Sequence, residues 1–168
     1  FALLLELTNQ VADHDRAVHD GAWAGCADFC FTLNPITELA GKTLGILGAG
    51  DIGRRVATIG HALGMDILIS SRTERDLGVP AQWTDVDNLF DVLTLHAPLT
   101  EDTHHLVNAE RLSSMKPSAY LINTARGPLI DEAALASALS NNTIAGAAVD
   151  VLSTEAPPAP PPPPPPPP

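Results

Sequence analysis

Thr43-Leu44-Gly45-Ile46-Leu47-Gly48-Ala49-Gly50-Asp51-Ile52-Gly53 is the stretch of this 168-residue chain that decides its fold. An apolar run leads into a G-x-G-x-x-G turn, and an amphipathic segment leads out of it. A backbone grips a pyrophosphate in this order of strand, glycine turn and helix. Gly48 permits the tight turn, Gly50 leaves room for phosphate, and Gly53 lets helix and strand pack closely. The stretch predicts a dinucleotide-binding unit, with a ligand-free glycine turn as the alternative.

The segment after the turn has the apolar spacing of an amphipathic helix. Its apolar residues recur at steps of four, three and four, so we expect this face to lie on a sheet: Ile52, Val56, Ile59 and Leu63. The free N–H groups of the helix would point at the bound phosphates, with Ile52 beside the cofactor. Asp51 also belongs to this predicted site, although its carboxylate would repel a pyrophosphate. It could instead cap the helix and face solvent.

The end of the next expected strand, 65–70, indicates which cofactor is preferred. NAD-binding units usually place an acidic residue here, about twenty residues past the glycines, to bind the ribose 2′-OH. Ser71, Arg72 and Thr73 stand there instead, and a guanidinium flanked by hydroxyl groups suits a 2′-phosphate. We therefore expect NADP(H) to be preferred, with NAD(H) possible. The alternative is that Arg72 is a solvated surface arginine, because two acidic residues follow it closely.

Composition limits the partners. The formal net charge is −11 at pH 7, which argues against nucleic acid or an anionic membrane as the main partner. No apolar run reaches the roughly 18 residues of a membrane span, and residues 1–5 lack the basic flank of a signal peptide. Cys26 and Cys30 are too few for a disulfide framework or a zinc site. We expect no metal, free thiols and a cytoplasmic location.

Strand-like and helix-like segments alternate along the rest of the chain. We expect strands at 91–95, 119–123 and 144–151, and helices at 109–115 and 131–140. This alternation indicates an α/β fold, a Rossmann-type doubly wound parallel sheet with helices on both faces. The expected order is a long N-terminal helix over 1–20, a connection over 21–40 and a Rossmann core over 41–152.

The last residues, 157–168, are proline apart from Ala159. Proline has no N–H donor and cannot join a central strand. We expect a disordered or polyproline II tail after a dinucleotide-binding domain of residues 1–156. Two interpretations of the tail stay open, a ligand for a proline-reading domain and a foreign stretch that replaces the natural continuation.

Four further motifs stand in order along the chain, ELAGKT at 38–43, LHAPLT at 95–100, INTARG at 122–127 and GAAVDV at 146–151. With the glycine turn, they resemble the D-2-hydroxyacid dehydrogenase family, which includes glyoxylate and hydroxypyruvate reductases, over about residues 1–158. The resemblance implies the nucleotide-binding domain of an oxidoreductase that reduces a small 2-keto acid to the D-2-hydroxy acid. It also implies a homodimer, because the family uses its N-terminal helix in the dimer.

The resemblance assigns roles to residues at the strand ends. Arg126 matches the arginine that binds the substrate, and its fork suits a carboxylate. Glu155 matches the acid that holds a histidine donor and raises its pKa, and Asp150 matches the residue that binds the nicotinamide carboxamide. His96 is given a structural role beside the cofactor, with the proton donor as its alternative role. The other expected cofactor contacts are Ala97, Pro98, Thr103, Thr124 and Ala125.

The chain departs from the family pattern at both ends. The acid–base histidine of the family lies one strand beyond the glutamate, but no histidine follows His105 here. The first half of the substrate domain, which precedes the N-terminal helix in the family, is missing as well. We expect cofactor binding with little or no turnover, because loss of a general acid costs about 10²–10⁴-fold. The alternative is a non-catalytic, dinucleotide-sensing interaction module like the corepressors of the family.

Overall fold

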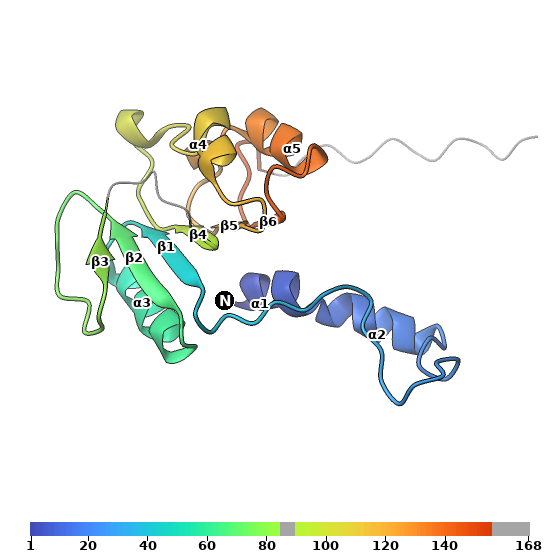
Figure 1. Cartoon of the computed structure of the whole chain (residues 1–168). Helices are drawn as coiled ribbons and strands as arrows, with labels where there is room; N and C mark the ends of the chain where they lie inside the picture. The colour runs from blue at the N-terminus through green and yellow to red at the C-terminus, as the bar shows by residue number, and fades with distance from the viewer. Residues whose placement is uncertain (85–89, 156–168) are drawn as a thin grey trace, which may run out of the picture.

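The structure is a computed structural model that describes residues 1–84 and 90–155, so the proline tail at 157–168 lies outside the described residues. A six-stranded sheet forms its centre, in the order β3-β2-β1-β4-β5-β6, and every pairing is parallel (Figure 1). The strands are β1 (Thr43–Leu47), β2 (Asp66–Ser70), β3 (Gln82–Trp83), β4 (Val92–Leu95), β5 (Tyr120–Asn123) and β6 (Gly146–Val149). The order reverses between β1 and β4, which confirms the predicted doubly wound parallel sheet.

Helices cover both faces of the sheet (Figure 1). One face carries α1 (Ala2–Asn9) and α3 (Asp51–Ala62), and the other carries α4 (Ala109–Ser114) and α5 (Glu132–Ser140). Each face buries its own apolar cluster, built around Leu44 on the first and Leu93 on the second. Because the sheet is covered on both sides, its central strands are apolar at almost every position.

The face of α3 that lies on the sheet is not the predicted one. Its buried residues are Gly53, Ala57 and Gly60, whereas three members of the predicted apolar stripe are exposed, namely Ile52, Ile59 and Leu63. A Cβ built on Gly60 would lie 2.6 Å from Cδ2 of Leu44. Small residues are therefore needed at this contact, and the larger apolar side chains stand beside it rather than in it.

Two helices replace the single N-terminal helix predicted over 1–20. Gln10 has a left-handed backbone (φ 53°), which ends α1 and begins α2 (Val11–His19). The side chain of Glu6 accepts a hydrogen bond from the N–H of Ala12, at 3.1 Å across the break. The first helix contacts β5 and β6, whereas α2 buries none of its residues. With the loop that follows, α2 extends away from the sheet (Figure 1).

The edges of the sheet also differ from the prediction. The short strand β3 was not predicted, since two residues are too few to show a period. The last strand ends at Val149 rather than at residue 151. Beyond the strand, the backbone at Leu152 and Ser153 leaves the sheet and lies directly against Gly127.

Candidate cofactor and substrate site

The carboxyl ends of the parallel strands meet at one edge of the sheet. The residues that follow β1, β2, β4, β5 and β6 are Gly48, Ser71, His96, Thr124 and Asp150. Ligands of open α/β sheets bind at this edge, where the strand order reverses. The fold thus brings residues that lie about 100 positions apart in the sequence into one row. The row runs from Ser71, in the predicted 2′-phosphate site, to Asp150.

The glycine turn fits a pyrophosphate. Gly48 has a φ of +106°, and a Cβ on it would lie 2.5 Å from the carbonyl oxygen of His96. A Cβ on Gly53 would lie 2.0 Å from the carbonyl oxygen of Gly48. Nothing lies within 4 Å of a Cβ built on Gly50. The outer glycines are therefore required by packing, and the middle one borders open space that a phosphate can enter.

The N-terminus of α3 opens onto the same space. Gly50 is its N-cap residue, and no side chain caps the helix. The first-turn N–H groups and the positive end of the helix dipole are therefore available to an anion. We predicted that Asp51 could cap the helix and face solvent; it faces solvent but does not cap the helix.

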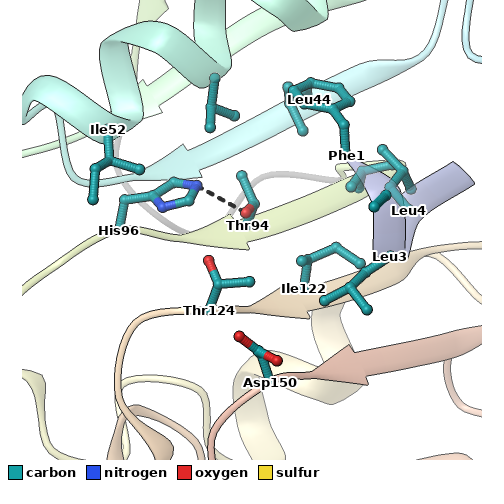
Figure 2. Close-up of a pocket in the computed structure, with 13 residues that line it drawn as sticks. Phe1, Leu3, Leu4, Leu44, Ile52, Thr94, His96, Ile122, Thr124 and Asp150 are labelled. Carbon is teal, nitrogen blue, oxygen red and sulfur yellow. Dashed lines mark hydrogen bonds between the residues drawn. The ribbon is translucent and has the colours of Figure 1, made fainter.

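Two adjoining cavities open at this edge, and Figure 2 shows the one that extends from the strand ends onto the face of the sheet beside α1. This cavity has a volume of about 320 Å³. The polar residues Thr94, His96, Thr124 and Asp150 lie toward one end of it, and the apolar residues Phe1, Leu3, Leu4 and Leu44 lie toward the other (Figure 2). The other, of about 520 Å³, is lined by Ile52, His96, Ala97, Pro98, Leu99, Thr124, Ala125 and Arg126. Ile52, His96 and Thr124 border both cavities. Most of the predicted nicotinamide and substrate residues therefore share one cleft.

His96 stands between the two cavities. Its backbone N–H donates to the carbonyl of Leu47 at 2.7 Å, and its ring Nε2 lies 3.0 Å from Oγ1 of the buried Thr94 (Figure 2). Burial lowers the pKa of His96 to about 4, so the ring is neutral at pH 7. A neutral imidazole is a poor acid, which favours the predicted structural role over a proton donor.

Arg126 reaches the cleft from the turn after β5. Its exposed guanidinium donates from Nη1 to the carbonyl of Ala125 at 2.6 Å. The fully buried Asn123 shapes this turn: its Nδ2 donates to the carbonyl of Arg126 at 2.9 Å, and its Oδ1 accepts from the N–H of Ala125 at 3.0 Å. The sequence prediction did not single out Asn123 as a positioning residue. The available signal was an amide side chain at the last position of a buried strand.

Glu155 is carried by a segment that is anchored on the Arg126 turn. A Cβ on Gly127 would lie 2.1 Å from the carbonyl carbon of Leu152, so the two backbones touch. The N–H of Ser153 donates to Oε1 of Glu132 at 2.5 Å. Glu155 lies two residues further on and is exposed. The structure thus brings the segments of both predicted catalytic residues together.

Thr103 is a predicted cofactor residue that borders neither cavity. It ends the 3-10 turn η1 (Glu101–Thr103). Its hydroxyl donates to the carbonyl of Pro98 at 2.7 Å and accepts from the N–H of Thr100 at 2.7 Å. Thr103 therefore holds the loop that carries Pro98 into the cleft.

The residues predicted to bind a 2′-phosphate lie at the other end of the row of strand ends. Ser71, Arg72 and Thr73 are all exposed after β2, and the carbonyl of Ser70 accepts the N–H of Gly48 at 2.9 Å, which joins this end to the glycine turn. Within the described residues, Arg72 forms no ion pair. The nearby Asp76 accepts the N–H of Gly78 instead, at 2.8 Å. The guanidinium is thus available to an anion.

Over residues 1–84 and 90–155, no helix is long and apolar enough to cross a bilayer. The same residues contain no group of three or more His, Cys, Asp or Glu side chains placed to hold a metal ion.

Comparison with known proteins agrees with this geometry. Residues 1–167 match the family of D-isomer specific 2-hydroxyacid dehydrogenases, NAD binding domain. The chain is 41% identical over 162 residues to a glyoxylate reductase of Thermofilum pendens, an alignment that covers 91% of this chain and 47% of the relative. The chain thus spans about half the length of this curated relative.

Solved structures with the same fold hold either nicotinamide cofactor. An acyclic imino acid reductase (Bsp5), solved in complex with NADPH and D-Arg, is 35% identical, with a TM-score of 0.81 over 92% of this chain and 49% of that one. A D-lactate dehydrogenase with NAD+ from Lactobacillus jensenii is 30% identical, with a TM-score of 0.77 over 90% of this chain and 46% of that one. The chain belongs to the D-isomer specific 2-hydroxyacid dehydrogenase family, as its NAD-binding domain.

Proposed function

We propose that this chain is the cofactor-binding part of an NADPH-preferring reductase that converts a small 2-keto acid of the glyoxylate or hydroxypyruvate type to the D-2-hydroxy acid. The observation that carries the proposal is the position of Arg126. It lies at the carboxyl end of β5, in the same cleft as His96 and Thr124. A guanidinium there can bind a carboxylate with two hydrogen bonds and place the keto carbon next to the nicotinamide.

Each group of residues then has one task. The glycine turn and the N-terminus of α3 bind the pyrophosphate, and Asp150 with Thr124 orients the carboxamide. His96, Ala97 and Pro98 form the wall of the nicotinamide pocket. The cofactor supplies a hydride when bound, and Arg126 stabilises the charge that develops on the substrate oxygen. Glu155 would hold a protonated histidine from outside these residues, which donates the proton.

The preference for NADPH is supported at the end of β2. A 2′-phosphate placed there meets Arg72 between two hydroxyl side chains, and no carboxylate follows the strand directly. Arg72 has no ion pair with any residue of the ranges 1–84 and 90–155. NADH would lack the phosphate that this guanidinium binds. We therefore expect Arg72 to make the affinity for NADPH higher than the affinity for NADH.

The test is a fluorescence titration of the chain with NADPH and NADH side by side. We expect NADPH to bind more tightly, and Arg72→Ala to reduce NADPH affinity by about tenfold or more with little effect on NADH, since a charge-assisted hydrogen bond is worth about 1.5–3 kcal/mol. Arg75→Ala, which removes an exposed arginine of the same segment, is the matched control and should leave both affinities unchanged. Equal affinities in the unaltered chain would overturn the proposed preference.

The same proposal predicts little turnover from these residues alone. Glyoxylate reduction by the chain should fall at least 10²–10⁴-fold below that of a full-length reductase, roughly the value of one general acid. Turnover at the full-length rate would contradict the assignment of the proton donor to residues outside this chain.

We also propose that the protein is a cytoplasmic homodimer. α2 and the loop after it expose several large apolar side chains, Val11, Val18, Trp23, Phe29, Leu33 and Ile36. Exposed apolar patches of this kind mark protein interfaces, which supports the dimer. Both cysteines of the chain are free thiols, which supports the cytoplasmic location because thiols stay reduced there. Sedimentation of the purified chain should show a dimer that Val18→Asp weakens, whereas a monomer at all concentrations would refute this part of the proposal.

A further inference from the structure

The segment after β6 carries two of the predicted functional carboxylates, Asp150 at its start and Glu155 further along. The N–H of Asp150 donates to the carbonyl of Asn123 at 2.9 Å, which ties the start of the segment to the end of β5. Both carboxylate side chains are exposed. Their positions therefore depend on the path that the backbone takes between them.

Side chains fill the space between this segment and α5 only in part. A cavity of about 200 Å³ is bordered by residues of both, among them Leu135 and Leu139 of the helix and Val151 and Leu152 of the segment. Where apolar side chains leave a gap, they lose the close contacts that would fix their positions. Packing of side chains alone therefore does not set the distance between the segment and the helix.

Glu132, which borders the same cavity, bonds the helix to the segment. It is the first residue of α5, and its Oε1 accepts the N–H of Ser153 at 2.5 Å. Next to this bond, the carbonyl carbon of Leu152 would lie 2.1 Å from a Cβ built on Gly127. The bond of Asp150 fixes the start of the segment, and the bond of Glu132 fixes its middle. Two fixed points give the segment a direction, whereas a single one would leave it free to turn.

We propose that Glu132 is a positioning residue, whose carboxylate fixes the segment so that Asp150 meets the nicotinamide carboxamide. The inference rests on the proposed function, from which it takes the role of Asp150. Glu132 is not among the described residues that line the two cavities of the cleft. It therefore acts through the backbone of the segment and not by contact with the cofactor. The same bond holds the backbone that leads to Glu155.

A purely structural role for Glu132 is the alternative. A carboxylate in the first turn of a helix interacts favourably with the helix dipole, which would stabilise α5 without any effect on the segment. Asp131 has a role of this kind, because its Oδ1 caps α5 by accepting the N–H groups of Ala133 and Ala134, both at 3.1 Å. Asp131→Ala weakens the same helix end and leaves the acceptor of the Ser153 N–H in place, so it is the matched control.

The experiment measures the affinities of two ligands for each variant of the full chain by titration calorimetry. NADPH would reach from the 2′-phosphate site to Asp150, whereas adenosine 2′,5′-bisphosphate carries the 2′-phosphate but no nicotinamide. We expect Glu132→Ala to weaken NADPH by about three- to tenfold, because a charge-assisted bond is worth about tenfold or more in affinity and this one is exposed to water. The affinity for the bisphosphate should be unchanged. Asp131→Ala should leave the ratio of the two affinities as it is in the unaltered chain.

Glu132→Gln separates the bond from the charge. The amide of glutamine keeps an acceptor oxygen for the N–H of Ser153, so this variant should retain NADPH affinity to within about twofold. Hydrogen exchange of the Ser153 amide follows the bond directly, and we expect it to be faster in Glu132→Ala than in Glu132→Gln or Asp131→Ala. Equal losses of NADPH affinity in both Glu132 variants, or parallel losses of both ligands, would mean a helix-stabilising role alone and would overturn the proposal.

Asp150→Ala distinguishes failure of this inference from failure of the proposed function. It should weaken NADPH and leave the bisphosphate unchanged, as Glu132→Ala does. If Asp150→Ala weakens NADPH and Glu132→Ala does not, the positioning role is overturned and the role of Asp150 stands. If Asp150→Ala does not weaken NADPH, the assignment of Asp150 to the carboxamide fails, and the positioning role fails with it whatever Glu132→Ala does.

Discussion

Two regions of the molecule are stabilised in different ways. One is the sheet with its covering helices, and the other is the projecting N-terminal arm, which we define as α2 and the loop up to Thr37. In β4 every residue is buried, whereas α2 has no buried residue at all. The arm is tied down by hydrogen bonds at a few points, such as the N–H of Thr37 to the carbonyl of Thr8 at 3.1 Å and the N–H of Leu33 to Nε2 of His14 at 3.2 Å.

This difference shows that the packing that stabilises the fold and the proposed cofactor site lie in one region. Apolar burial, which dominates folding free energy, lies on the two faces of the sheet, and the cleft lies at the end of the same strands. The arm carries apolar side chains without burying them. Changes in the sheet region should therefore affect folding and binding together. Changes in the arm should affect neither the folding of a single chain nor its cofactor binding, and act only on the proposed dimer.

The largest expected effect comes from Gly53→Val. Its side chain would collide with the carbonyl oxygen of Gly48, so α3 would have to move away from β1. We expect NADPH affinity to fall about 100-fold or more, with lower stability, because a backbone clash cannot be relieved by a rotamer change. Gly50→Ala is the contrast, since it meets nothing within 4 Å. It should fold normally and lose affinity only, and titration with circular dichroism separates the two outcomes.

The next largest effect compares Leu93→Ala with Val18→Ala. Leu93 is fully buried between the sheet and α4 and α5, so truncation should cost about 2–5 kcal/mol in the free energy of unfolding. Val18 is 43% exposed in the arm, and its truncation should change that free energy by about 0.5 kcal/mol or less. Urea unfolding at one chain concentration, low enough for the chain to be monomeric by sedimentation, measures both. Equal costs would mean that the arm is part of the cooperative core.

A third expected effect is a loss of stability in acid that depends on His96. The unfolded chain protonates this residue near its ordinary pKa of about 6.5, whereas burial keeps it neutral in the folded chain down to about pH 4. The unfolded state therefore binds more protons between these values, so stability falls as the pH is lowered through this window.

Unfolding of the unaltered chain and of His96→Asn at pH 7 and pH 4.5 checks this effect. We expect the unaltered chain to lose on the order of 1–2 kcal/mol more than the variant, a value reduced by the partial access of water to the ring. Identical losses in the two chains would mean that the pKa of His96 is not lowered.

The smallest expected effect concerns the joint between α1 and α2. Gln10 adopts a left-handed backbone that glycine adopts without strain. Gln10→Gly and Gln10→Ala both remove the bond from Asn34 to the side chain of Gln10, so only the backbone differs between them. We expect the glycine variant to be more stable by about 1 kcal/mol and NADPH affinity to be the same in both. A more stable alanine variant would show that a straight helix over 1–20 is accessible.

Parts of this protein could be predicted because local patterns report them. The glycine turn is recognised by the spacing of its glycines, and the strands are recognised as apolar runs between turns. The class of sheet, and the edge predicted to bind the cofactor, therefore follow from the sequence. The face of α3 could not be predicted from apolar spacing. Close packing against β1 requires small residues there, and an apolar period cannot distinguish a helix that packs closely from one that packs at ordinary distance.

The parallel sheet, the glycine turn and the order of the cleft residues along the chain can all be predicted from local sequence, because each depends on residue types within a few positions of one another. Three features become visible only in the folded chain: the break at Gln10, the role of Asn123 in shaping the Arg126 turn, and the contact of Leu152 with Gly127. These features depend on backbone conformation and on contacts between surfaces in three dimensions, which no local pattern of residue types records.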